Sequence, residues 1–201
     1  MNRRAMFRPL PALLACLVAL SACSRSQAEA PRPPLEGGRI GGDFALVDKT
    51  GKPVRFSDFA GRYRIVYFGY TFCPDVCPLD VQRLMQGYNA FAKAEPEVAA
   101  RVQPIFVTID PARDGPKEVG EFAAAFSPRL LGLTGSEEQV AAAAKMFAAY
   151  RAKGETRPDG GYLMDHSRIA YLMDPQGKPL AMLPVDQDAD AVAAELAKWT
   201  S

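Results

Sequence analysis

The stretch RIVYFGYTFCPDVCPLDVQRL (residues 64–84) decides the fold of this 201-residue chain. Its first seven residues, 64–70, are β-branched or aromatic almost throughout, which predicts a strand buried on both faces of a sheet. Cys73 and Cys77 follow directly, and each precedes a proline. Apolar residues then recur at close to helical spacing over 79–94, which predicts a helix. The stretch therefore predicts a central strand that leads through two cysteines into a helix.

The sequence on either side predicts alternating strands and helices. A strand is expected at 102–110, a helix opened by proline at 116–126, a short strand at 130–135 and a helix with Ser136 as N-cap at 136–150. Hairpins are expected at 44–56 and 168–185, a single helical turn near 57–61, a polar, mobile loop at 151–161 and a last helix at 188–200. The alternation implies parallel core strands with right-handed crossovers. We therefore expect an α/β, thioredoxin-like fold, with a central mixed sheet flanked by helices and an N-terminal β-hairpin extension.

The N-terminus has the features of an export signal. Three arginines precede an apolar run at 10–23 that is too short to span a membrane and ends in Leu20-Ser21-Ala22-Cys23, which resembles a bacterial lipobox. We therefore expect a lipoprotein signal peptide at 1–22, a lipidated Cys23, a flexible tether at 23–42 and the folded domain at 43–201. This predicts anchoring by lipid at the periplasmic face of a bacterial membrane. Plain cleavage after a small residue or an uncleaved anchor is the alternative.

Charge and cysteine content narrow the possible functions. The formal net charge is +1, which argues against a nucleic-acid partner. With Cys16 removed in the signal peptide and Cys23 lipidated, Cys73 and Cys77 are the thiols expected in the exported domain. Export places this pair where disulfides can persist.

The prolines indicate where the two thiols lie. Two mid-helix positions four residues apart hold their Cβ atoms about 5–6 Å apart, whereas a disulfide needs about 3.5–4.5 Å. Because proline suits the first helical turn, Pro78 predicts a helix that starts near Cys77, with Cys73 in the preceding loop. The helix N-terminus is expected to lower the thiol pKa. A structural disulfide between Cys73 and Cys77 would close a very short loop and would therefore add little stability through chain entropy. Redox chemistry and metal binding remain as the two possible functions of the pair.

His166 is the single histidine of the chain. It precedes the strand expected next to the central strand, and in the predicted sheet the loop before that strand faces the cysteine loop. Two thiolates and an imidazole are a soft ligand set that suits trigonal Cu(I). Zinc would need a fourth ligand, and an iron–sulfur cluster would need four thiolates.

Three motifs in order resemble those of the Sco/SenC family, copper-handling assembly factors for cytochrome c oxidase. They are FGYTFCPDVCP (68–78), VTIDPARD (107–114) and DHSRIAYLMDPQGK (165–178), and the resemblance covers about residues 40–200. The resemblance implies that Cys73, Cys77 and His166 ligate copper, as Cu(I) or Cu(II). It also implies that Asp110 and Asp114 form an acidic pair near the site and that Asp165 helps to orient the histidine loop. For the acidic pair, a role as loop cap and turn residues is the alternative.

The same resemblance implies a function and its partners. The chain would be a metallochaperone that delivers copper to the dinuclear copper centre of oxidase subunit II, after loading from a copper donor protein. Where some family members have a histidine before the first cysteine, this chain has Phe72, which removes one possible ligand.

Other functions compete for the same residues. A thiol–disulfide oxidoreductase that reduces the oxidase cysteines, or a redox sensor, would use Cys73 and Cys77 as a redox-active pair. The CxxxC spacing and the lack of a proline before residue 168 are not typical of thioredoxins. A peroxiredoxin would need proline at Val66 and threonine at Tyr70. A non-catalytic interaction module leaves the thiol pair and the histidine unexplained.

Overall fold

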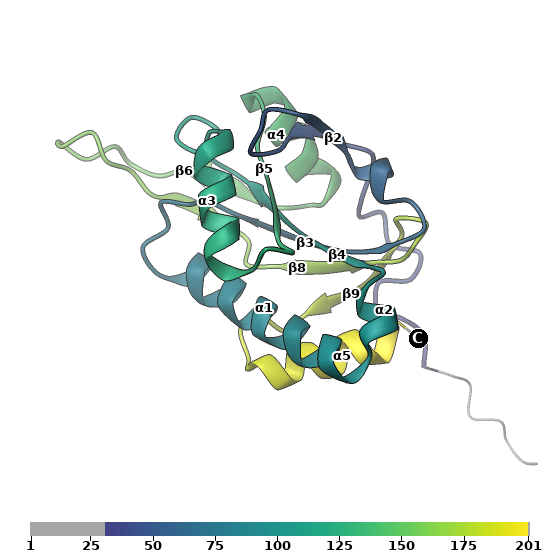
Figure 1. Ribbon diagram of the computed structural model, residues 1–201. Helices are drawn as coiled ribbons and strands as arrows, with labels where there is room; N and C mark the ends of the chain where they lie inside the picture. Colours follow the sequence, from purple (N-terminus) through teal and green to yellow (C-terminus); the bar gives the residue numbers. More distant parts are fainter. Residues whose placement is uncertain (1–30, 201) are drawn as a thin grey trace, which may run out of the picture. The chain divides into compact units, whose positions relative to one another are not determined.

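The structure, a computed structural model, describes residues 31–200 (Figure 1). The strands are β1 (Ala45–Val47), β2 (Pro53–Arg55), β3 (Tyr63–Gly69), β4 (Val102–Thr108), β5 (Leu131–Leu133), β6 (Arg151–Lys153), β7 (Met164–His166), β8 (Ala170–Met173) and β9 (Pro179–Leu183). The α-helices are α1 (Val76–Ala94), α2 (Pro96–Ala99), α3 (Pro116–Phe126), α4 (Glu137–Met146) and α5 (Ala189–Trp199). A 3-10 turn, η1 (Phe56–Phe59), follows β2.

The main sheet has five strands in the order β5-β4-β3-β8-β9, with β3 at its centre. Strands β3, β4 and β5 are parallel, and β8 and β9 continue the sheet with antiparallel pairing. The strand that follows His166 therefore pairs directly with the central strand. This confirms the expected arrangement, in which the start of β8 and the end of β3 lie at the same edge of the sheet.

Helices cover both faces of this sheet (Figure 1). Ile65 and Tyr67 of β3 pack on one face with side chains of α1, α3 and α5. Val66 and Phe68 pack on the other face with side chains of α4 and the β1–β2 hairpin. Because successive side chains of a strand point to opposite faces, a strand covered on both sides reads as the continuous apolar run seen in the sequence.

The structure corrects two boundaries at the helix α4. The predicted helix at 136–150 keeps its N-cap, Ser136, but ends at Met146, and Ala148 has a positive φ of 50°. The Met146 carbonyl accepts a hydrogen bond from the Gly41 N–H, 2.8 Å away, so a distant segment caps this helix end. The predicted mobile loop at 151–161 begins with β6, which pairs with β7 as a separate two-stranded sheet.

The folded unit begins at Pro33, ten residues before the predicted domain start. Leu35 donates its N–H to the Leu180 carbonyl, and Leu35 and Ile40 pack against the core. Residues 33–42, predicted as part of the tether, are therefore held on the domain by two apolar side chains that lie outside any recognisable periodic pattern. The signal peptide, Cys23 and the tether up to residue 30 lie outside the described residues. Within residues 31–200, no helix is long and apolar enough to cross a membrane.

Candidate metal site

The cysteine pair lies where the central strand meets α1. The helix begins at Val76, so Cys77 occupies its first turn and Cys73 lies in the loop before it, as the prolines predicted. Cys77 is fully buried and Cys73 is half-buried, and both are free thiols. The Cys77 N–H points at the Cys73 sulfur, 3.4 Å away. The loop thus brings both sulfurs to one end of the helix.

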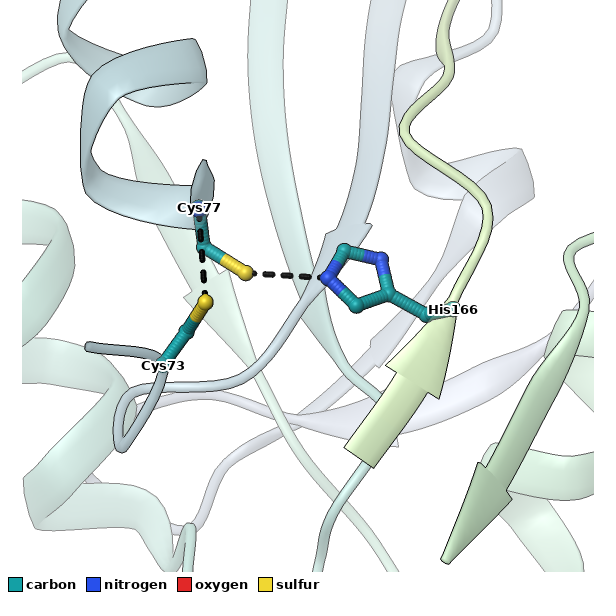
Figure 2. Close-up of side chains that lie close together, drawn as sticks. All are labelled: Cys73, Cys77 and His166. Atoms are coloured by element: carbon teal, nitrogen blue, oxygen red, sulfur yellow. Dashed lines mark hydrogen bonds between the residues drawn. The ribbon is translucent and has the colours of Figure 1, made fainter. Parts of the chain in front are cut away.

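His166, the last residue of β7, reaches the same point from the other side (Figure 2). Its Nε2 atom lies 3.0 Å from the Cys77 sulfur, and its Nδ1 atom lies 2.9 Å from the Ser167 carbonyl oxygen. Because a carbonyl oxygen only accepts hydrogen bonds, Nδ1 carries the ring proton and Nε2 has its lone pair directed at the sulfur. The three ligand atoms of Cys73, Cys77 and His166 lie within 4.8 Å of one another.

Burial sets the charge of this cluster in the absence of metal. It raises the pKa of the Cys77 thiol, with further contributions from Cys73, and it lowers the pKa of His166. The expectation of a lowered thiol pKa is wrong for Cys77, because burial outweighs the Tyr70 backbone hydrogen bond that lowers the pKa. Cys77 and His166 therefore face each other as a neutral thiol and a neutral imidazole at pH 7.

Asp114 supports the cysteine loop without reaching the thiols. Its buried carboxylate accepts hydrogen bonds from the Thr71 N–H (2.9 Å), the Thr71 hydroxyl (2.6 Å) and the Thr108 hydroxyl (2.6 Å). Burial raises its pKa, and these hydrogen bonds oppose the rise. Asp114 thus ties Thr71, two residues after β3, to the end of β4, which matches the alternative role of a loop cap.

Asp110 is buried beside the site, and its partners are Arg113 and Tyr162. Arg113 Nε donates to one carboxylate oxygen at 2.5 Å, and the Tyr162 hydroxyl donates to the other at 2.9 Å. Asp165, in contrast, is exposed, and in the described part of the chain its side chain forms no hydrogen bond. The His166 Nδ1 atom has the Ser167 carbonyl as its partner, and the role of Asp165 in orienting the histidine loop stays a prediction.

The sequence analysis missed an ion pair near the site, between Asp80 and Arg168. Asp80, one turn after Cys77 on α1, is fully buried and accepts two hydrogen bonds from Arg168, at 2.6 and 2.9 Å. The Tyr67 hydroxyl donates to the same carboxylate at 3.0 Å. Arg168 follows His166 by two residues, so the pair connects the cysteine helix to the histidine segment. An acid at i+3 from Cys77, on the helix face that carries the thiol, was the available signal.

Comparisons with known proteins agree with this architecture. The family model described as SCO1/SenC matches residues 32–201. The mouse protein named "Protein SCO2 homolog, mitochondrial" is 43% identical over 136 residues, which are 68% of this chain and 52% of the mouse protein. The chain spans about half the length of the curated relatives it matches first.

Solved structures extend the comparison to three dimensions. Arabidopsis thaliana ScoI with copper bound has a TM-score of 0.73 and 34% sequence identity, over 79% of this chain and 96% of that one. BsSco, described as having a disulfide switch and as a member of the Sco family of cytochrome c oxidase assembly proteins, has a TM-score of 0.63 and 22% identity, over 86% of this chain and 98% of its own. The predicted thioredoxin-like α/β fold is confirmed. Since the family model covers nearly all of the described residues and the mouse protein is 43% identical, the chain belongs to the SCO1/SenC family.

Proposed function

We propose that this protein is a membrane-anchored copper chaperone that delivers copper to the dinuclear copper centre of cytochrome c oxidase subunit II. In this proposal Cys73, Cys77 and His166 bind the copper ion that is the cargo. The observation that carries the proposal is the convergence of two free sulfurs and one imidazole nitrogen within 4.8 Å. The solved Arabidopsis relative with copper bound supports copper as the metal.

The ligand set fits a single soft ion. First-row metals bond to thiolate sulfur and imidazole nitrogen at about 2.0–2.3 Å, so two ligands of one ion lie at most about 4.6 Å apart. The three atoms lie within 4.8 Å of one another, and the Cys77 sulfur is 3.0 Å from the His166 Nε2 atom. Shifts of up to about 1 Å would bring them to the spacing of about 3.7–4.0 Å that a trigonal ion with these bond lengths requires. Two sulfurs and one nitrogen suit Cu(I), while the imidazole also allows Cu(II).

The exposure of the ligands suggests how copper leaves. Cys77 is fully buried, whereas Cys73 is half-buried and lies on the loop. An incoming sulfur or nitrogen ligand of the target meets the ion from the Cys73 side and replaces Cys73 first. Ligand exchange then proceeds inward, and the relative affinities of the two proteins set its direction.

The proposed partners and location follow from the N-terminus and from the family. A lipid on Cys23 would hold the domain at the periplasmic face of a bacterial membrane, close to the membrane-bound oxidase. A copper donor protein would load the site. The description of BsSco as one of the oxidase assembly proteins supports the oxidase as the target, and the name of the mouse relative places that relative in mitochondria.

A thiol–disulfide oxidoreductase that keeps the oxidase cysteines reduced, or a redox sensor, is the second candidate. The nearness of the two thiols favours it, as does the disulfide switch described for BsSco. The burial that raises the pKa of Cys77 argues against rapid general reduction, because the thiolate is the nucleophile.

Both candidates can be tested on one sample. We expect anaerobic titration with Cu(I), in competition with a chromophoric chelator, to show one copper per chain. Cys73→Ala, Cys77→Ala and His166→Ala should each weaken binding by more than about 100-fold, because losing a ligand costs more than losing a hydrogen-bond partner behind one. Met164→Leu is the matched control, because Met164 is a soft side chain two residues from His166 that is not proposed as a ligand, and it should bind as the wild type does.

The metal-free protein is then assayed for reduction of insulin and of a subunit II peptide that carries a disulfide. Copper binding with slow reduction supports the chaperone. Rapid reduction by a protein that does not bind copper would replace it with the oxidoreductase. Full Cu(I) affinity and an unchanged Cu(II) spectrum in His166→Ala would refute the three-ligand site.

A further inference from the structure

Arg113 contacts both segments that carry the proposed ligands, although it belongs to neither. It lies in the loop between β4 and α3. Its guanidinium carbon is 5.0 Å from the ring centroid of Phe72 and 3.6 Å from that of Tyr162. Phe72 immediately precedes Cys73, and Tyr162 precedes His166 by four residues. We call these three residues and Asp110 the Arg113 bridge.

Polar contacts fix the orientation of the guanidinium plane. Nε donates to the Asp110 carboxylate at 2.5 Å, and Nη1 donates to the Tyr162 carbonyl at 2.9 Å. The Tyr162 hydroxyl donates to the second oxygen of Asp110 at 2.9 Å. Arg113 and Tyr162 thus share one carboxylate whose side chain is only 4% exposed. Because the guanidinium is planar and donates in fixed directions, these contacts determine where its faces point.

The Phe72 ring lies at the surface, under the guanidinium of Arg113. The residue is 53% exposed, so burial alone does not hold its ring in one position. The Arg113 Nη2 atom, in contrast, is buried and has no hydrogen-bond partner in the described part of the chain. A guanidinium that has lost part of its water is attracted more strongly to an aromatic face. The ring next to Cys73 is therefore held by a cation that is itself anchored to the histidine segment.

We propose that Arg113 is a positioning residue that holds the Cys73 loop against the segment of His166, so that copper affinity and copper geometry both depend on it. This inference rests on the proposed copper binding at Cys73, Cys77 and His166. It gives Phe72 a function in this chain: its ring is the contact through which Arg113 restrains the first cysteine.

The test compares four variants with the wild type: Arg113→Ala, Phe72→Leu, Phe72→Tyr and the double variant Arg113→Ala with Phe72→Leu. Cu(I) affinity is measured by chelator competition, and the thiolate-to-Cu(II) absorption bands and the EPR spectrum report the geometry. We expect Arg113→Ala and Phe72→Leu each to weaken Cu(I) binding about 10-fold, in the upper range for a cation–ring contact. The Cu(II) bands should shift in the same direction in both.

Two features separate positioning from general destabilisation. Phe72→Tyr keeps the ring and should keep wild-type affinity and spectra. The double variant should bind no more weakly than the weaker single variant, because both changes remove the same contact. Phe72→Leu alters a half-exposed side chain and should fold, so the test does not depend on the stability of Arg113→Ala. Lys117→Ala, which removes an exposed charge at the start of α3, is the control for charge.

The outcomes distinguish this inference from the proposed function. If the wild type binds no copper, the proposed function fails and the inference fails with it. If the wild type binds copper while Phe72→Leu and Arg113→Ala keep its affinity and spectra, the proposed function stands and the positioning role is wrong. Weakening in Phe72→Tyr equal to that in Phe72→Leu, or additive losses in the double variant, would also overturn it.

Discussion

The two segments that carry the proposed ligands are held in different ways. The cysteine segment lies between β3 and α1, two elements of the main core, and Cys77 is fully buried there. The histidine segment runs through β6 and β7, which form a two-stranded sheet separate from the main one. Its contacts with the rest of the domain include the pairs Arg168–Asp80 and Arg151 Nε with the Ile109 carbonyl at 2.9 Å.

The ligands of one site are therefore held in place by two different kinds of contact. Core packing positions the buried Cys77 thiol. Side-chain contacts from other elements hold the histidine segment and, through Arg113 and Phe72, the loop of Cys73. Changes in long polar side chains should therefore disturb the histidine segment, and changes in core volume should disturb Cys77. The predictions below test this division in order of decreasing effect.

Arg168→Ala should have the largest effect, because it leaves the fully buried Asp80 carboxylate without its cation. Breaking a buried ion pair from one side costs about 3–5 kcal/mol. Arg168 is 40% exposed and Tyr67 still donates to Asp80, so we expect about 2–3 kcal/mol. Urea unfolding of the metal-free protein measures the loss.

The matched control for Arg168→Ala is Lys117→Ala, which breaks an exposed contact of 3.9 Å with Glu121 and should cost less than about 0.5 kcal/mol. Replacing both Asp80 and Arg168 with leucine should recover part of the stability, because no buried charge is left unpaired. If Arg168→Ala lost no more stability than Lys117→Ala, the ion pair of Arg168 with Asp80 would not hold the histidine segment in place.

Gly69→Ala should act on the cysteine side. A Cβ at this position would lie 2.9 Å from the Tyr67 ring, 3.1 Å from the Phe106 ring and 3.3 Å from the Cys77 sulfur. These rings are fully buried, so we expect overpacking to cost about 1–3 kcal/mol and to displace the Cys77 thiol. Unfolding measures the cost, and the rate at which a thiol reagent modifies Cys77 reports the displacement.

Gly115→Ala provides a comparison for Gly69→Ala in the loop after β4. There the nearest atom to the new Cβ is the end of the Glu118 side chain, which can move away. We expect a loss below about 1 kcal/mol and unchanged Cys77 reactivity. Equal losses in the two variants would mean that the packing around Gly69 does not position the thiol.

Asp114→Asn should have the smallest effect, and one that depends on pH. Because burial raises the Asp114 pKa, the folded state binds this proton more tightly than the unfolded state does. The resulting stabilisation is complete below the unfolded pKa of about 3.8 and is lost as pH rises through the folded pKa. The stability of wild type minus that of Asp114→Asn should therefore fall with rising pH, by at most about 1.4 kcal/mol per unit. Urea unfolding between pH 3.5 and 7 tests the sign, and a difference that rises with pH would contradict it.

The sequence alone determined the central part of this architecture. The apolar run at 64–70 indicated a strand buried on both faces, and the prolines after Cys73 and Cys77 placed the start of α1 within one residue of its position. Pro116 and Ser136 likewise marked the starts of α3 and α4. These features are local, since a dipeptide or a short apolar period already restricts the backbone, and so they can be read without knowing what packs nearby.

Only the tertiary structure decided the features that depend on distant partners. The end of α4 depends on a hydrogen bond from Gly41, and residues 33–42 join the domain through Leu35 and Ile40. The pKa of Cys77 rises because the whole fold buries it, although the sequence places it in the first turn of a helix. The contacts of Asp80 and Arg113 join residues 88 and 49 positions apart in the chain. No sequence period encodes such pairings, because they arise only when the packed sheet brings separate loops to the same edge.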